Sequence, residues 1–152
     1  MLSPFQWSKL GSRLVRRPLN TTDTMPRIIV PAVLLIVAAI HALPLVGVLS
    51  AAHVSSLYGV AVRDANLEIL LRHRAVLFGL LAGVLGYCAL RPALHGVGLI
   101  AASVSIVLFL LIARNVGGYN EALSTVVRVD VLAAVLVVVG AVVHLVPRPA
   151  AG

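Results

Sequence analysis

Four long apolar stretches constrain this chain more than any other feature of its sequence. Each stretch is about 20 residues or longer, and at about 1.5 Å per residue a helix of that length spans the hydrocarbon core of a bilayer. Because lipid cannot satisfy backbone polar groups, such segments must be helical. The sequence therefore predicts an all-α polytopic membrane protein, a four-transmembrane-helix bundle. The stretches run from about Ile28 to Leu49, Leu67 to Leu90, Ala93 to Ala113 and Leu123 to Val146.

The composition excludes several other classes of protein. Hydrophobic residues make up 61% of the chain and charged residues 11%, whereas a soluble domain is about 25% charged. This excludes a soluble single domain, a disordered chain and a disulfide scaffold. Cys88 is the only cysteine and lies in an apolar stretch, so we expect it to pack as a small hydrophobe. The near absence of lysine beside abundant arginine hints at a GC-rich bacterial genome.

Three segments are expected. Residues 1–27 form a basic, polar N-terminal segment, 28–146 the membrane domain, and 147–152 a short tail. The first 27 residues either place a short helix in the membrane interface or, if Met25 is the true start, are largely not expressed, and we expect residues 1–24 to pack little against the bundle. Pro44 is expected to kink the outer end of the first helix. The turn at Arg91-Pro92 is short enough to make the second and third helices antiparallel neighbours.

The basic residues predict an orientation in the membrane. The net charge of +7 would suggest nucleic acid in a soluble protein, but these bases lie between apolar stretches, where they orient the chain. The side with both termini holds more of them, so we expect both termini in the cytoplasm of a bacterial inner membrane. Starting at Met25 would reverse the balance. The bases are Lys9, Arg13, Arg16, Arg17, Arg27, Arg91 and Arg148 on that side, and Arg63, Arg72, Arg74, Arg114 and Arg128 on the other.

Ionisable residues inside a membrane are candidates for function. At about 100° per residue, Glu68, Arg72, Arg114 and Asp130 fall on helix faces that carry small residues, and we expect those faces to point inward. Asp130 is expected to pair with Arg72 or Arg114, with His41 at the border. The cluster is either a structural ion-pair network or a ligand site. Its members are His41, Glu68, Arg72, Arg114 and Asp130.

Other charged residues are expected to face lipid. Arg74 aligns with Phe78, Leu81 and Leu85, and Arg128 with valines, so both should snorkel to the membrane surface. On the second stretch, Gly79, Gly83 and Gly86 are expected to face a neighbouring helix.

We expect no bound metal, haem or other cofactor. The histidines lack ligand spacing, and His41 with His73, or His95 with His144, are poorly matched axial pairs. No catalytic motif of a known enzyme class is present.

The segments Leu57-Tyr58-Gly59-Val60 and Leu67 to Gly79 resemble a family of small, uncharacterised four-helix bacterial inner-membrane proteins that are DoxX-like. The resemblance extends over Ile28 to Val146 and implies a four-helix bundle with no established reaction. Some proteins of this appearance carry the name phosphopantetheine adenylyltransferase, which belongs to soluble enzymes with an HxGH motif. The nearest match here, His95-Gly96-Val97-Gly98, does not fit that motif.

Three functions are compatible with these patterns. The first is a non-enzymatic accessory subunit or binder of a small ligand or lipid, with the bilayer as its surroundings and room for a protein partner or a second copy. The second is a membrane-embedded redox or quinone-linked subunit, which the DoxX-like resemblance implies. The third is a small homodimeric transporter, for which a midplane acid or a broken helix is typical. Neither feature is evident, so the first function is favoured.

Overall fold

The computed structural model describes the backbone of residues 21–146 and the side chains of residues 28–146, and this part of the chain is all-α. Four of its helices are long and apolar enough to cross a membrane, each 21 to 25 residues over the candidate span. The predicted fold class is confirmed. The elements are α2 (Thr21–Ala42), the 3-10 helix η1 (Leu43–Val48), α3 (Ala51–Tyr58), α4 (Ala65–Ala89), the 3-10 turn η2 (Pro92–Leu94), α5 (His95–Val116) and α6 (Glu121–Leu145).

The predicted disturbance at Pro44 is a change of helix type. The α-helix α2 ends at Ala42 and the chain continues as the 3-10 helix η1, with Pro44 in its first turn. Proline has no N–H to donate to the preceding turn of an α-helix, so the regular hydrogen bonding stops there. At its other end α2 begins at Thr21, seven residues before the apolar span at Ile28. The remaining expectations for residues 1–27 and 147–152 lie outside the described residues.

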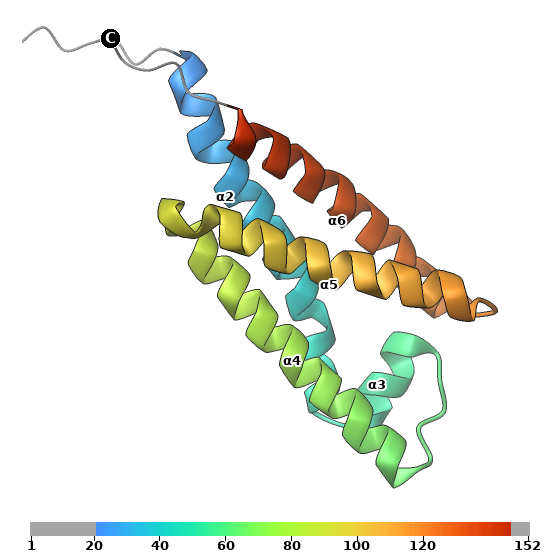
Figure 1. Cartoon of the computed structure of the whole chain (residues 1–152). Helices are drawn as coiled ribbons and strands as arrows, with labels where there is room; N and C mark the ends of the chain where they lie inside the picture. Colours follow the sequence, from blue (N-terminus) through green and yellow to red (C-terminus); the bar gives the residue numbers. More distant parts are fainter. Residues whose placement is uncertain (1–20, 147–152) are drawn as a thin grey trace, which may run out of the picture.

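The four long helices alternate in direction, with α2 in contact with α4, α5 and α6 (Figure 1). The beginning of α2 and the end of α6 lie at one end of the bundle. The opposite end carries η1, α3 and the loop between α5 and α6, and we call it the α3 end. Helices α4 and α5 are close at the turn η2 and diverge toward the α3 end, which leaves room there for α3 and for the hollows described below.

A close contact between helices α4 and α5 lies at the end opposite α3. A Cβ atom added to Gly98 of α5 would lie 2.8 Å from Cβ of Cys88 and 3.1 Å from a methyl group of Leu34. Because Gly98 has no side chain, α4 and α5 can approach here and close the bundle around Leu34 of α2. Cys88 is buried in the core, as expected for a small hydrophobe.

The prediction that the glycine face of α4 points into the bundle was wrong. A Cβ atom added to Gly83 or Gly86 would meet nothing within 4 Å, whereas Leu85, expected to face lipid, is completely buried. Gly79 does meet a neighbour, the side chain of Leu45 in η1. The glycine that permits close packing belongs to α5, so α4 can present large side chains to the interior.

Asn120 joins the α3 end to the bundle. Its side-chain oxygen accepts a hydrogen bond from the Leu123 N–H at 2.9 Å and so caps α6. Its amide nitrogen donates to the carbonyl oxygens of Tyr58 and Gly59, at 2.8 and 3.1 Å, where α3 ends. One side chain therefore fixes the start of α6 and the end of α3 together.

We expect Asn120→Ala to lower the free energy of unfolding by about 1–2 kcal/mol, because a cap and two further hydrogen bonds are lost. Denaturant titration in detergent micelles, followed by thiol labelling of the buried Cys88, measures this at the opposite end of the bundle. The matched control is Asp64→Ala, which removes the cap of α4, a hydrogen bond to the Leu67 N–H, but no contact with α3. Equal losses in the two variants would contradict the joining role of Asn120.

Candidate functional site

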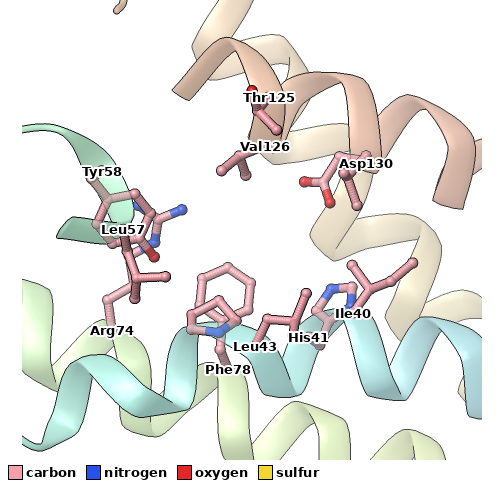
Figure 2. Close-up of a pocket in the computed structure, with 12 residues that line it drawn as sticks. Ile40, His41, Leu43, Leu57, Tyr58, Arg74, Phe78, Thr125, Val126 and Asp130 are labelled. Carbon is pink, nitrogen blue, oxygen red and sulfur yellow. The ribbon is translucent and has the colours of Figure 1, made fainter. Parts of the chain in front are cut away.

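A cavity of about 190 Å³ lies at the α3 end between α2, η1, α3, α4 and α6 (Figure 2). Its wall is largely apolar, and five polar side chains interrupt it. They are His41, Tyr58, Arg74, Thr125 and Asp130. The apolar lining consists of Ile40, Leu43, Pro44, Leu57, Phe78, Val126 and Val129.

Asp130 and Arg74 reach this cavity from opposite sides, with His41 and Phe78 along one wall between them (Figure 2). Each lies nine residues after the first residue of its helix, α6 and α4 respectively. At 1.5 Å per residue both are therefore about 14 Å from the α3 end of their helices. A carboxylate and a guanidinium thus face each other at similar depth across an apolar space.

The structure contradicts the prediction that Arg74 faces lipid. This arginine was expected to snorkel to lipid, but it is half-buried and its guanidinium carbon lies 5.1 Å from the ring centre of Phe78, 5.4 Å from that of Tyr58 and 5.6 Å from that of Phe109. Aromatic faces attract a cation at such distances. The reason for the error is the face of α4: the face carrying Phe78 and Leu85 points inward, and Arg74 lies on it.

His41 forms part of the cavity wall and is anchored on both sides. Its Nδ1 lies 2.9 Å from the Val37 carbonyl oxygen, which can only accept, so Nδ1 carries the proton and donates. Its Nε2 lies 3.3 Å from the Ser105 hydroxyl on α5. The ring is buried and its centre lies 5.6 Å from that of Phe78. His41 and Asp130 both line the cavity.

The expected ion pair of Asp130 with Arg72 or Arg114 was wrong. Among residues 28–146, Asp130 forms no ion pair with either arginine. Arg72 instead pairs with Glu68 at 3.0 Å, and its Nε donates to the Val48 carbonyl oxygen at 3.0 Å. Glu68 and Arg72 therefore fasten α4 to η1 and do not line the cavity.

Arg114 lies apart from the cavity as well. It is exposed at the end of α5, beside Gly117, Gly118 and Tyr119. Arg128 is exposed on α6 and pairs with Glu121. Of the five predicted site residues, the structure thus brings together His41 and Asp130, and it adds Arg74 and Tyr58 to them.

The two histidine pairs considered as axial ligands are in unlike surroundings. His73 is exposed while His41 is buried. His95 is buried and its Nε2 lies 3.2 Å from the Ala89 carbonyl oxygen, so it bridges the turn between α4 and α5. Within the described part of the chain, no three His, Cys, Asp or Glu side chains gather in a metal-binding arrangement.

Arg74 also borders two further hollows. One lies at the α3 end beside Tyr58, Tyr119 and Asn120. The other lies where α4 and α5 diverge, beside Phe109 and other apolar residues of α5. The guanidinium therefore stands where the cavity meets a hollow at the α3 end and an apolar groove.

These observations define a class of protein, a four-span all-α membrane protein with an amphipathic cavity at one end of its bundle. Comparison of the chain with protein-family models, with curated proteins and with solved structures found no match.

Proposed function

We propose that the protein binds a small amphipathic molecule in the cavity between Arg74 and Asp130. The observation that carries this proposal is that the two side chains line one apolar cavity without forming an ion pair. A charge held inside a membrane without a partner is costly. A ligand with polar groups at these two positions and an apolar body would compensate both charges and fill the space between them.

The surroundings of the cavity support entry from the α3 end. The hollow beside Tyr58 and Tyr119 shares Arg74 with the cavity, so a ligand passing Arg74 moves from the bundle's end into its interior. Helices α4, α5 and α6 each run unbroken, whereas the first span changes from α2 to the 3-10 helix η1 beside the cavity. A binding role also suits an accessory subunit that presents its ligand to a partner.

We also propose a cellular location. Membership of the DoxX-like group of bacterial inner-membrane proteins would place the protein in the bacterial inner membrane. Both termini in the cytoplasm would place the α3 end, and hence the mouth of the cavity, on the outer side. The balance of basic residues supports this orientation.

The test is retention of the ligand during purification. Native mass spectrometry of the protein in mild detergent should show a bound molecule of discrete mass. Val129→Phe places a ring into the cavity and should abolish this adduct. The matched control is Val135→Phe on the same helix, whose site is 57% exposed and lines no part of the cavity; this variant should keep the adduct. An adduct that survives Val129→Phe, or no adduct in the unmodified protein, would contradict the proposal.

A further inference from the structure

We propose that the ligand is a zwitterion whose anionic group binds Arg74 and whose primary ammonium group binds Asp130. This inference rests on the proposed function and adds the chemical class of the ligand. Three observations carry it: the hydrogen-bonding state of Arg74, that of Asp130, and the position of both on one apolar cavity.

Arg74 has its aromatic contacts but lacks an acceptor. Three ring faces surround its guanidinium group, and no hydrogen bond from it to another described residue is formed. The aromatic rings contact the guanidinium group but accept no hydrogen bond from its N–H donors. A guanidinium group presents these donors as a fork that fits a carboxylate or a phosphate. Arg74 is thus prepared to bind an anionic group.

Asp130 lacks a donor in the same way. Within residues 28–146 it forms neither a hydrogen bond nor an ion pair, and it is half-buried on the cavity wall. His41 and Arg74 line the same cavity as its carboxylate. The ring nitrogens of His41, however, are engaged with Val37 and Ser105. An ionised carboxylate only accepts hydrogen bonds, and a primary ammonium offers three donors.

The charges together select a zwitterion. A ligand with only an anionic group would satisfy Arg74 but bring a second negative charge toward Asp130. A ligand with only a cationic group would do the reverse toward Arg74. A zwitterion gives each half-buried charge a partner of opposite sign and adds no net charge to the membrane interior. The apolar wall, with Phe78 and Leu57, accepts the rest of the molecule.

Two sources offer this chemistry. One is a free α-amino acid with an apolar side chain that enters from the α3 end. The other is the phosphoethanolamine headgroup of a membrane lipid. Both carry an anionic group and a primary ammonium a few bonds apart, and separate arms of one experiment distinguish them.

The first arm measures binding of leucine, N-acetylleucine and leucinamide to the purified full chain by calorimetry. The second measures competition among phosphatidylethanolamine, phosphatidylglycerol and phosphatidylcholine by native mass spectrometry. In the arm that holds the ligand, removing either charge should weaken binding at least about tenfold, since a hydrogen bond to a charged group is lost. Phosphatidylcholine should also bind more weakly, because its quaternary ammonium has no N–H.

Variants assign each charge to its residue. Asp130→Asn should remove the discrimination against N-acetylleucine or phosphatidylglycerol, and Arg74→Gln should remove that against leucinamide. The control Arg128→Gln alters an exposed arginine on the same helix as Asp130 and should leave both preferences unchanged. The ligand series on the unmodified protein already decides the matter if a variant does not fold.

The inference fails if a ligand with a single charge, or with none, binds as tightly as the zwitterions in both arms. In that case an adduct seen by native mass spectrometry would still support the proposed binding function. Loss of that adduct as well would contradict the proposed function itself, so the two failures are distinguishable.

Discussion

Gly98→Ala is expected to lower the free energy of unfolding by about 2–3 kcal/mol, the upper part of the usual range for overpacking a core. The added Cβ would lie 2.8 Å from Cβ of Cys88, a distance that real Cβ contacts essentially never show. Neither Cys88 nor Leu34 can move away easily, because both are fully buried where α2, α4 and α5 meet. The two helices would have to separate at the contact that closes the bundle.

Gly83→Ala is the matched control for this prediction. A Cβ atom at Gly83 meets nothing within 4 Å, so this variant should change stability by no more than about 0.5 kcal/mol. Thermal unfolding in detergent, followed by circular dichroism, compares the two variants. If the Gly83 variant were the less stable one, the inward face of α4 would be the glycine face after all.

Leu34→Ala is expected to cost about 2–4 kcal/mol of unfolding free energy. Leu34 is completely buried, and its methyl groups reach the contact at Gly98. In a membrane the unfolded helix remains in an apolar solvent, so the loss comes from packing contacts and the cavity rather than from transfer to water. Removing three carbons from this position leaves a void that three helices line.

The neighbouring residue supplies the control. Leu35 is 48% exposed, and Leu35→Ala should cost less than about 1 kcal/mol because lipid replaces the lost contacts. Denaturant titration in micelles gives both values. Similar losses at the two positions would mean that α2 does not divide into the buried and lipid-facing sides described here.

The four spans could be predicted because the bilayer imposes one strong rule. A segment in lipid must be helical and about 30 Å long, so apolar length alone located α4, α5 and α6 to within a few residues. The first helix, α2, begins seven residues before the predicted stretch and gives way to η1 at Leu43. Chain breaks at Pro44 and at Arg91-Pro92 could be predicted for a similar reason, since proline cannot continue a helix. These properties depend on single segments and need no knowledge of how the segments pack.

The orientation of each helix was harder to predict. On α6 the inward placement of Asp130 was correct, because Asp130 lines the cavity and Val137 of the same face is buried. The same reasoning failed on α4, where Gly83 faces outward. A glycine marks a close contact only if a neighbouring backbone approaches it, and on this bundle Gly98 of α5 provides that approach for α4.

Arg74 could not have been assigned to the cavity from any one segment. Its surroundings come from Tyr58 of α3, Phe78 of α4 and Phe109 of α5, residues separated by up to about fifty positions in the chain. The spacing of Arg74 and Phe78 along one helix was a usable signal, because residues four apart share a face. The glycine face of α4 instead favoured Arg72, which forms a local ion pair with Glu68.

The most direct measurement of the central claim identifies what lies in the cavity within a native membrane. A photo-reactive phenylalanine analogue placed at Val126, which lines the cavity, is activated in membranes and the attached molecule is identified by mass spectrometry. The same analogue at Val138, which is 61% exposed on α6, reports the bulk lipid. We expect Val126 to capture a discrete amphipathic molecule that Val138 does not enrich. Identical products from the two positions, in the proportions of the bulk lipid, would contradict a specific binding site between Arg74 and Asp130.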